Sequence, residues 1–244
     1  MAEEITEIHS LAEACGADPY LLWAAQGFAP GVRAWSVQGA VAVASPRVCA
    51  RDRVVLSGEP EGAAQLAALA LEEMGSGFRP QGDATLVRAV LARLPWLRLV
   101  EEFGWMQTRA VPGDAARGAE WIPRTGWAEV AWLLARANPS SYAQVGMDGV
   151  SRWAGSRTAG ELAAVAADAW SSAEVGFIAG VGAAPALRGR GFGRQVCARV
   201  ASDLLETRPL AALLVDADNA AAIALYRGLG FEWRSVASCQ ARRT

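Results

Sequence analysis

The stretch that decides the fold is Arg188-Gly189-Arg190-Gly191-Phe192-Gly193, which follows an apolar run from 175 to 183 and opens a helical pattern. Three glycines in six residues let the backbone approach a ligand with no Cβ atom in the way. The amides of residues 189–194 can converge on an anion at the start of the helix, where the dipole favours negative charge. Guanidinium groups, which bind phosphate oxygens in bidentate fashion, come from Arg188, Arg190 and Arg194. The stretch therefore predicts an anion-binding loop.

Other glycine-rich phosphate loops fit less well. A P-loop is excluded because no Gly-Lys-Ser/Thr follows the glycines. A dinucleotide-binding fold would place the glycines after its first strand, whereas this loop follows the third strand of its half. A turn with solvated arginines is the alternative that the loop alone leaves open.

The residues around the loop predict an ordered set of strands and helices. A hairpin over 151–154 and 162–166, turned by Thr158-Ala159-Gly160, precedes the strand from 175 to 183. The helix from 193 to 206 has an apolar face at Val196, Val200 and Leu204. A short apolar strand follows at 210–215, then a helix with Asn219 as N-cap and Gly230 beyond its end. The order is strand–strand–strand–helix–strand–helix–strand, which is a mixed α/β arrangement.

The first half of the chain repeats this order. Strands are expected at 32–37, 40–44 and 53–57, followed by a helix from 63 to 74. Turn-forming residues at 111–118 mark a junction, and a helix that begins near Trp127 and stops before Pro139 opens the second half. We therefore expect two related domains, 1–112 and 113–244.

Composition limits the function classes. The net charge of −2 argues against nucleic-acid binding, and the chain lacks an apolar run that could span a membrane. The first residues lack the layout of a secretion signal, so we expect a cytoplasmic protein. A single histidine, His9, and four scattered cysteines argue against a metal site and against a Ser-His-Asp triad.

The pattern Arg188-x-x-Gly191-x-Gly193, with Pro185 before it and Asn219, Tyr226 and Leu229-Gly230-Phe231 after it, resembles the GNAT acetyltransferase superfamily. The resemblance runs from about Trp127 to Val236. It implies an α/β (α+β) fold with a mixed, mostly antiparallel sheet and flanking helices, splayed by a bulge in the strand that ends near Ala183. The related halves imply a tandem GNAT-like chain.

The same resemblance implies acetyl-CoA as co-substrate and no metal. The pantetheine arm would lie along the strand at Val181-Gly182-Ala183, bonding backbone groups of Val181 and Ala183. The pyrophosphate would sit on Arg188, Gly189, Arg190, Gly191, Phe192, Gly193 and Arg194. Asn219 would help to hold the pantetheine or neighbouring backbone, and Tyr226 would lie near the thioester sulfur.

A neutral amine must attack the thioester, so a general base is needed, and its identity stays open. Glu174 at the start of the cofactor strand is the first candidate, although a shift of one residue in register would turn its side chain to the other face. The alternatives are Glu161, Asp168, Glu232 and a chain of water molecules. Tyr226 could protonate the departing thiolate, although an aromatic residue on a helix is more often part of the core. Trp121, Trp127 and Tyr142 are candidates for acceptor contact.

The expected function is acetyl transfer to a primary amine, on a small molecule, by direct attack in a ternary complex, in a monomer or homodimer. A non-catalytic acyl-CoA sensor and a protein (lysine or N-terminal) acetyltransferase are the alternatives. The loop Ser57-Gly58-Glu59-Pro60-Glu61-Gly62 stands where the first half would hold phosphates, and it carries carboxylates in place of arginines. We therefore expect the first half to be degenerate and not to bind CoA.

Overall fold

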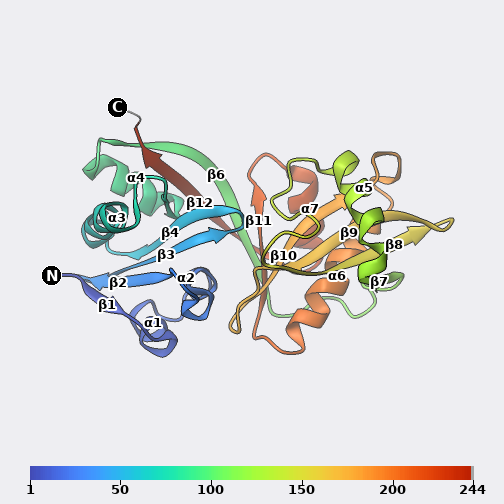
Figure 1. Cartoon of the computed structure of the whole chain (residues 1–244), viewed down its shortest axis with the longest axis horizontal. Helices are drawn as coiled ribbons and strands as arrows, with labels where there is room; N and C mark the ends of the chain where they lie inside the picture. The colour runs from blue at the N-terminus through green and yellow to red at the C-terminus, as the bar shows by residue number, and fades with distance from the viewer. Residues whose placement is uncertain (243–244) are drawn as a thin grey trace. The chain divides into compact units, whose positions relative to one another are not determined.

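The computed structural model describes residues 1–242, which form two compact units (Figure 1). The first unit contains residues 1–105 and 216–218 and the described residues from 234 onward. The second contains residues 106–215 and 219–233. The first unit therefore takes residues from both ends of the chain.

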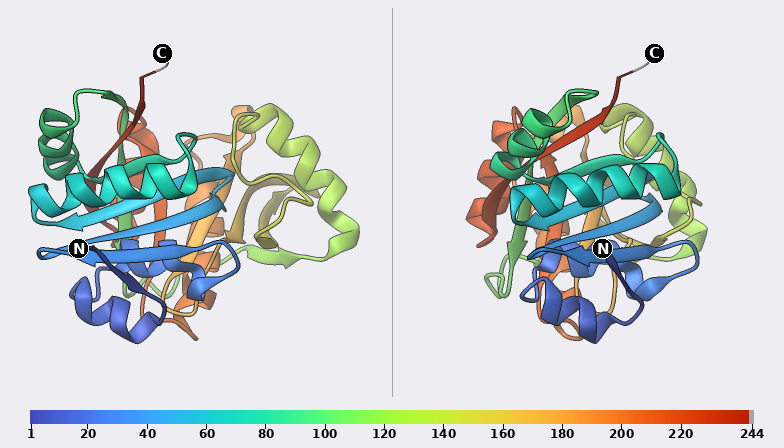
Figure 2. Two further views of the ribbon diagram at one scale, coloured as in Figure 1. Left: turned by 60° about the vertical axis from the view of Figure 1, so that its left-hand side comes forward. Right: turned by 90° about the vertical axis from the view of Figure 1, so that its left-hand side faces the viewer.

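The first unit is a sheet with helices on both faces. Its elements are β1 (Glu3–Ile5), α1 (Ile8–Ala14), α2 (Pro19–Ala25), the 3-10 turn η1 (Gln26–Phe28), β2 (Arg33–Val37), β3 (Ala40–Val48), β4 (Arg51–Gly58), α3 (Pro60–Met74), β5 (Arg79–Asp83), α4 (Ala84–Arg93) and the start of β6 (Leu97–Thr108). The strand order is β1-β2-β3-β4-β5-β12, with β4 and β5 parallel and the pairs β1–β2, β2–β3, β3–β4 and β5–β12 antiparallel. Figure 2 shows α3 on one face of this sheet and α1 and α2 on the other.

The second unit repeats the arrangement. Its elements are β7 (Ala119–Ile122), the 3-10 turn η2 (Arg124–Gly126), α5 (Trp127–Ala137), β8 (Val150–Thr158), β9 (Glu161–Ala169), β10 (Gly176–Ala183), the 3-10 turn η3 (Pro185–Leu187), α6 (Phe192–Leu205), β11 (Ala211–Asp216), α7 (Ala220–Gly228) and the start of β12 (Glu232–Ala241). The strand order is β11-β10-β9-β8-β7, with β10 and β11 parallel and the pairs β9–β10, β8–β9 and β7–β8 antiparallel. The β8–β9 hairpin turns at Ala159 and Gly160, which both have left-handed backbones, as a two-residue turn requires.

The mixed, mostly antiparallel sheet with flanking helices is confirmed, as is the repeated order of elements. The sequence pattern missed β5 and α4 of the first unit, which lie between Arg79 and Arg93. The reason is that β5 reads Arg-Pro-Gln-Gly-Asp, a composition that favours turns rather than strands.

Most of the last strand, β12, lies in the first unit, whereas the expected division at 112/113 places it in the second. Val236, Ala237 and Ser238 of β12 pair antiparallel with Asp83, Gly82 and Gln81 of β5. Ala237 and Cys239 are fully buried in the core that α3 and α4 form over the first sheet. The C-terminal strand thus completes the first unit, because its apolar alternation fits that core. None of the helices in residues 1–242 is long and apolar enough to cross a membrane.

The core of the second unit depends on α6. Leu204 is fully buried, and its Cβ lies 2.6 Å from the place where a Cβ on Gly176 of β10 would stand. Leu205, the next residue, is only partly buried against the same core. The helix therefore packs on the strand through one residue of this pair.

We expect Leu204→Ala to lower the free energy of unfolding by about 3 kcal/mol, because it removes buried methyl groups and leaves a cavity. Leu205→Ala is the matched control and should cost roughly 1 kcal/mol or less, since that side chain is part exposed. Urea unfolding followed by circular dichroism measures both. Equal losses for the two variants would contradict this packing.

Candidate functional site

In the second unit the pairing of two neighbouring strands stops part-way along their length, and we call the strand edge that this leaves unpaired the slot. β10 and β11 pair in parallel at Gly176↔Ala211 and Phe177↔Ala212, although β10 continues to Ala183. The pairing of β10 with β11 ends at Phe177. An open strand edge offers backbone donors and acceptors to an extended ligand.

A bulge causes this separation. The register of β10 against β9 shifts between Ala179 and Gly182, and Gly180 has a left-handed backbone (φ 63°). Before the bulge, Ile178 belongs to the core beneath α6; after it, Val181 and Ala183 pack against that core instead. The bulge therefore exchanges the faces of the strand, as an extra residue does when side chains alternate.

Gly180 is fixed by its surroundings as well as by its backbone. A Cβ atom at this position would lie 2.4 Å from Cη2 of Trp153, which is fully buried, and 3.2 Å from Cβ of Ala143. No other residue fits without moving the indole. The sequence analysis did not single out Gly180, although an isolated glycine inside an apolar strand is a known sign of a bulge.

The glycines of the loop serve two different needs. Gly189 (φ 76°) and Gly191 (φ 87°) have left-handed backbones, with no atom within 4 Å of an added Cβ. Gly193 has an ordinary backbone, but its Cβ would lie 3.3 Å from Cδ1 of Leu225, so it allows α7 to approach α6. The predicted freedom of the loop is thus found at 189 and 191, and a packing role at 193.

The N-terminus of α6 is open to an anion. Gly191 is the N-cap and provides no side-chain cap, and the first turn has no acidic residue. Gln195 N donates to Gly191 O at 3.1 Å, so the amides of residues 192–194 precede that bond of the helix. Together with the dipole they form a site for negative charge.

The three arginines of the loop are placed differently. Arg188 donates to two backbone carbonyls, with Nη2 3.0 Å from Ala137 O and Nε 3.4 Å from Ala183 O. It therefore ties the end of β10 to the end of α5. Arg194 Nη1 lies 3.3 Å from Gly228 O, and Arg190 is exposed. Arg190 and Arg194 are thus better placed than Arg188 to give charge to a phosphate.

The strand edge has a neighbour that the sequence analysis missed. Asn138, the C-cap of α5, donates from Nδ2 to Val181 O at 3.1 Å. Cβ of Asn138 also lies 3.9 Å from the place of a Cβ on Gly182. One lone pair of the Val181 carbonyl is therefore already used. An asparagine directly before a proline that ends a helix is the signal that could have drawn notice to it.

Asn219 and Tyr226 belong to α7. Asn219 Oδ1 accepts from Ala222 N at 3.1 Å, which confirms the predicted N-cap. Tyr226 is 5% exposed, and its ring centroid lies 5.9 Å from that of Phe231. Burial, and then the neighbouring Cys197, raise the pKa of Tyr226 well above its usual value. The phenol is therefore protonated at neutral pH, so in a reaction it can serve as a general acid but not as a general base.

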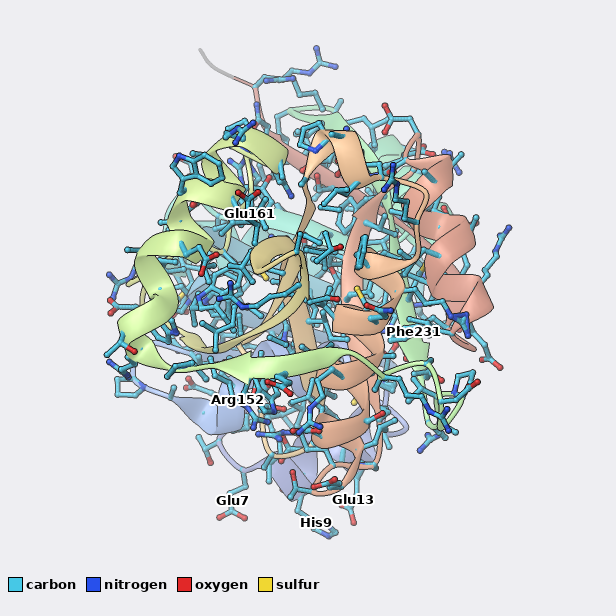
Figure 3. The ribbon with its side chains drawn as sticks, turned by 90° about the vertical axis from the view of Figure 1, so that its right-hand side faces the viewer. Glu7, His9, Glu13, Arg152, Glu161 and Phe231 are labelled. Atoms are coloured by element: carbon cyan, nitrogen blue, oxygen red, sulfur yellow. The ribbon has the colours of Figure 1, made fainter. Side chains whose placement is uncertain are left out.

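The four candidate bases have different surroundings. Glu174 precedes β10, and its Oε2 is buried without a hydrogen-bond partner among residues 1–242. Asp168 is 5% exposed and lies 3.2 Å from Arg152 in an ion pair. Glu161 and Glu232 are exposed first residues of β9 and β12. Arg152 and Glu161 lie towards opposite ends of the β8–β9 hairpin (Figure 3). Glu174 is thus the carboxylate with a buried, unoccupied oxygen.

The three aromatic candidates for acceptor contact also have different surroundings. Trp121 donates to Asp203 of α6, and the guanidinium carbon of Arg152 lies 3.8 Å from its ring centroid, so this indole is held in a polar cluster. Trp127 begins α5, with the guanidinium of Arg124 4.9 Å from its ring, and Tyr142 is 41% exposed. Acceptor contact by Trp121, Trp127 or Tyr142 stays a prediction.

The corresponding place in the first unit is built otherwise. β4 and β5 stay paired over four residues, up to Leu56↔Gly82, and only Ser57 and Gly58 of β4 extend beyond. α3 then begins with Pro60, which has no amide hydrogen, and carries an acid in its first turn. The strand edge is therefore short and the helix start is unsuited to phosphate.

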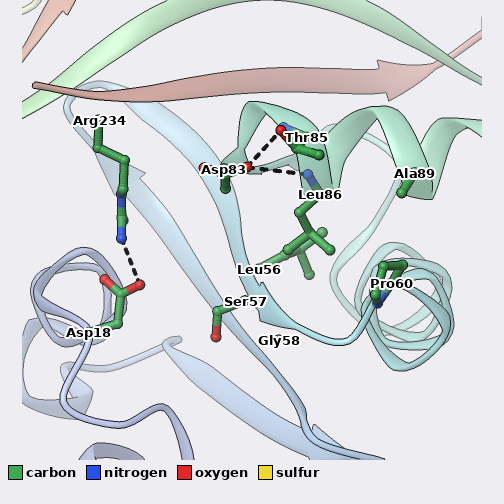
Figure 4. Close-up of a pocket in the computed structure, with 10 residues that line it drawn as sticks. All are labelled: Asp18, Leu56, Ser57, Gly58, Pro60, Asp83, Thr85, Leu86, Ala89 and Arg234. Carbon is green, nitrogen blue, oxygen red and sulfur yellow. Dashed lines mark hydrogen bonds and ion pairs between the residues drawn. The ribbon is translucent and has the colours of Figure 1, made fainter.

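A cavity of about 410 Å³ lies beside this short edge (Figure 4). Asp83 accepts from the amides of Thr85 and Leu86, which caps α4. Arg234 lies 2.8 Å from Asp18 in an ion pair. The amides at the start of α4 and the guanidinium of Arg234 are thus already bound to carboxylates. That the first unit does not bind CoA stays a prediction. Among residues 1–242, no group of three or more His, Cys, Asp or Glu could hold a metal ion.

Comparisons with known proteins agree with this geometry. Residues 155–239 match the family model described as FR47-like protein. No curated protein matches the chain. A GCN5-related N-acetyltransferase from Kribbella flavida is 17% identical, with a TM-score of 0.56, and the match covers 84% of this chain and 87% of that chain. One from Sphaerobacter thermophilus is 16% identical, with a TM-score of 0.58 and coverages of 99% and 95%. A tandem GNAT protein from the clavulanic acid biosynthesis pathway is 12% identical, with a TM-score of 0.53, and covers 100% of both chains.

At these identities the solved structures show the fold. The chain has the GNAT fold, and the expected resemblance to the GNAT superfamily is confirmed. The match to a tandem protein agrees with the repeated order of elements in the two units. The family model covers the segment from β8 into β12, which holds the slot and the loop.

Gly180→Ala should lower the free energy of unfolding by several kcal/mol, because it combines a left-handed backbone with a clash against a buried indole. Gly189→Ala is the matched control: its backbone is also left-handed, but its surroundings are empty, so we expect a loss of about 1 kcal/mol. Thermal and urea unfolding of the two variants give the comparison. A loss at Gly180 no larger than at Gly189 would show that Trp153 does not hold the bulge.

Proposed function

We propose that the second unit is an acetyl-CoA-dependent N-acetyltransferase that acetylates a primary amine on a small molecule by direct attack in a ternary complex. The observation that carries the proposal is the pairing of two features in one unit. An open edge of β10 leads into a helix start with neither cap nor acid. The first suits the amide-rich pantetheine arm, and the second suits the pyrophosphate.

The chain's own groups would hold acetyl-CoA along this path. The amides of residues 189–194 would receive the pyrophosphate, with charge from Arg190 and Arg194. Backbone groups of β10 from Val181 to Ala183 would bond the pantetheine, with Asn138 holding the Val181 carbonyl. Arg188 would keep the end of β10 in place through Ala137 and Ala183. Acetyl-CoA supplies an activated acyl group as a thioester.

The acceptor amine arrives as an ammonium and must lose a proton before its nitrogen can attack the carbonyl carbon. Glu174 is our candidate to take that proton, directly or through water, because its Oε2 is buried and free of other hydrogen bonds. As the C–N bond forms and the C–S bond breaks, the sulfur needs a proton. Tyr226 would give it, since its raised pKa keeps it protonated.

A covalent acyl-cysteine route has little support in this structure. Cys197, which lies next to Tyr226 in the core, is fully buried, and burial raises the pKa of its thiol to about 12. A nucleophilic cysteine needs a thiolate near neutral pH. Direct attack by the amine therefore fits the second unit better than a two-step transfer.

Calorimetry should find one acetyl-CoA site per chain, in the second unit. Arg190→Ala and Arg194→Ala should each weaken binding about tenfold or more, because each removes a charge-assisted contact to phosphate. Arg98→Ala, at an exposed position of β6 in the first unit, is the control for the lost charge. Two sites per chain would contradict the degenerate first unit, and unchanged affinity in both loop variants would contradict the phosphate site.

Turnover is measured as thiol release from acetyl-CoA with a library of amines. Tyr226→Phe should lower kcat about 100-fold while acetyl-CoA affinity stays the same, since the phenol acts on the leaving group. The raised pKa of Tyr226 also predicts no loss of kcat up to pH 9, because the phenol stays protonated there. CoA binding without turnover on any amine would indicate a sensor, and turnover on peptides alone would indicate a protein acetyltransferase.

A further inference from the structure

The turn that joins β9 to β10 is fixed by the hydroxyl of Ser172. Its Oγ accepts from the amides of Glu174 at 3.2 Å and Val175 at 3.1 Å. The amide of Ser172 donates in turn to Val175 O at 2.9 Å. A serine that accepts from amides two and three residues ahead fixes the local backbone. Ser172 is 7% exposed, so little water is at hand to replace these bonds.

Ser171 fastens the same turn to the strands on both sides. Its hydroxyl lies 2.6 Å from Asp168 Oδ1 and accepts from Phe177 N at 2.8 Å. Asp168 is itself held by Arg152 on β8. Phe177 is the last residue of β10 that pairs with β11. The serine therefore connects the end of β9 to the point where the slot opens.

Two further contacts hold the ends of the turn. Arg208 Nε donates to Ser172 O at 2.8 Å. Trp170 has a left-handed backbone (φ 52°), and its amide donates to Gly149 O at 2.7 Å. A bulky residue takes that conformation only where its surroundings impose it. A Cβ on Gly149 would lie 2.3 Å from Nε1 of Trp170, so the indole lies directly on that glycine.

These contacts fix the backbone around Glu174, the candidate general base. The amide of Glu174 is held by Ser172, whereas its Oε2 is buried and has no partner among residues 1–242. Burying a carboxylate oxygen without a partner costs free energy, so a fold that only needed a stable turn would gain by replacing it. Glu174 lies three residues before Phe177, roughly 10 Å of strand, within reach of the slot through a side chain and a water molecule.

We propose that Ser172, assisted by Ser171, is a positioning residue that holds Glu174 so that Oε2 receives the proton of the acceptor amine. The inference rests on the proposed function. The proton leaves the ammonium nitrogen for Glu174, directly or through one water, and passes to solvent after the product departs. Neither serine touches either substrate; both act through the backbone of the turn.

A double-mutant cycle with Glu174→Gln tests this role. Ser172→Ala should lower kcat about tenfold, as expected from two lost hydrogen bonds, with the acetyl-CoA Kd unchanged within about twofold. In the Glu174→Gln background, Ser172→Ala should have no further effect on kcat, because the group that it positions is already gone. Ser172→Thr keeps the hydroxyl and should recover most of the rate. Ser235→Ala, at an exposed serine of β12, is the control.

Independent, multiplicative losses in the double mutant would overturn the inference, as would an unchanged kcat in Ser172→Ala. If Ser172→Ala does not fold, Ser171→Ala gives the same test, with a smaller loss that should also vanish in the Glu174→Gln background. If the wild type is active and the serine variant keeps the same kcat, only the positioning role is refuted. A wild type without thiol release on any amine refutes the proposed function and the inference together.

Discussion

The second unit depends on the contact between the backbone of Gly180 and the indole of Trp153. That contact leaves no room for a Cβ atom, and it keeps β10 in a left-handed step. The step changes which side chains face α6 and takes the strand away from β11. An unpaired strand edge is usually a liability in a protein. Here the same strand leads along the chain into a helix start that is suited to negative charge, so the unpaired edge and the anion site are neighbours in the sequence.

The two units show how one scaffold can be kept while its chemistry changes. Both have a parallel pair of strands connected by a helix, yet the pair stays closed over four residues in the first unit and opens after two in the second. At the helix starts, Pro60 and Glu61 stand in one unit and Phe192 and Gly193 in the other. The order of strands and helices therefore determines the fold, whereas a few residues at one strand end determine whether a ligand binds.

The sequence predicted most of the second unit. Periodicity and turn-forming residues report local patterns. The local patterns here are the glycines with alternating arginines, the apolar face of α6, the N-cap at Asn219 and the hairpin turn at Gly160. Features that depend on distant residues were not predictable. The pairing of β12 with β5, the bonds from Arg188 to Ala137 and from Asn138 to Val181, and the contact of Trp153 with Gly180 each join segments more than 25 residues apart. The choice among the four carboxylates stayed open for the same reason, since the surroundings of Glu174 come from several elements.

The placement of β12 has a consequence for how the chain is made. The sheet of the first unit begins with residues 3–5 and is completed by residues 236–238, almost the full length of the chain later. During synthesis β5 is made well before β12, so this edge of β5 has no partner until β12 has been synthesised. Pairings at such separations slow folding, because a long loop must close before they form. The anion-binding half is thus enclosed in sequence by the half that does not share its loop, and the first sheet can be completed only after the second unit has been synthesised.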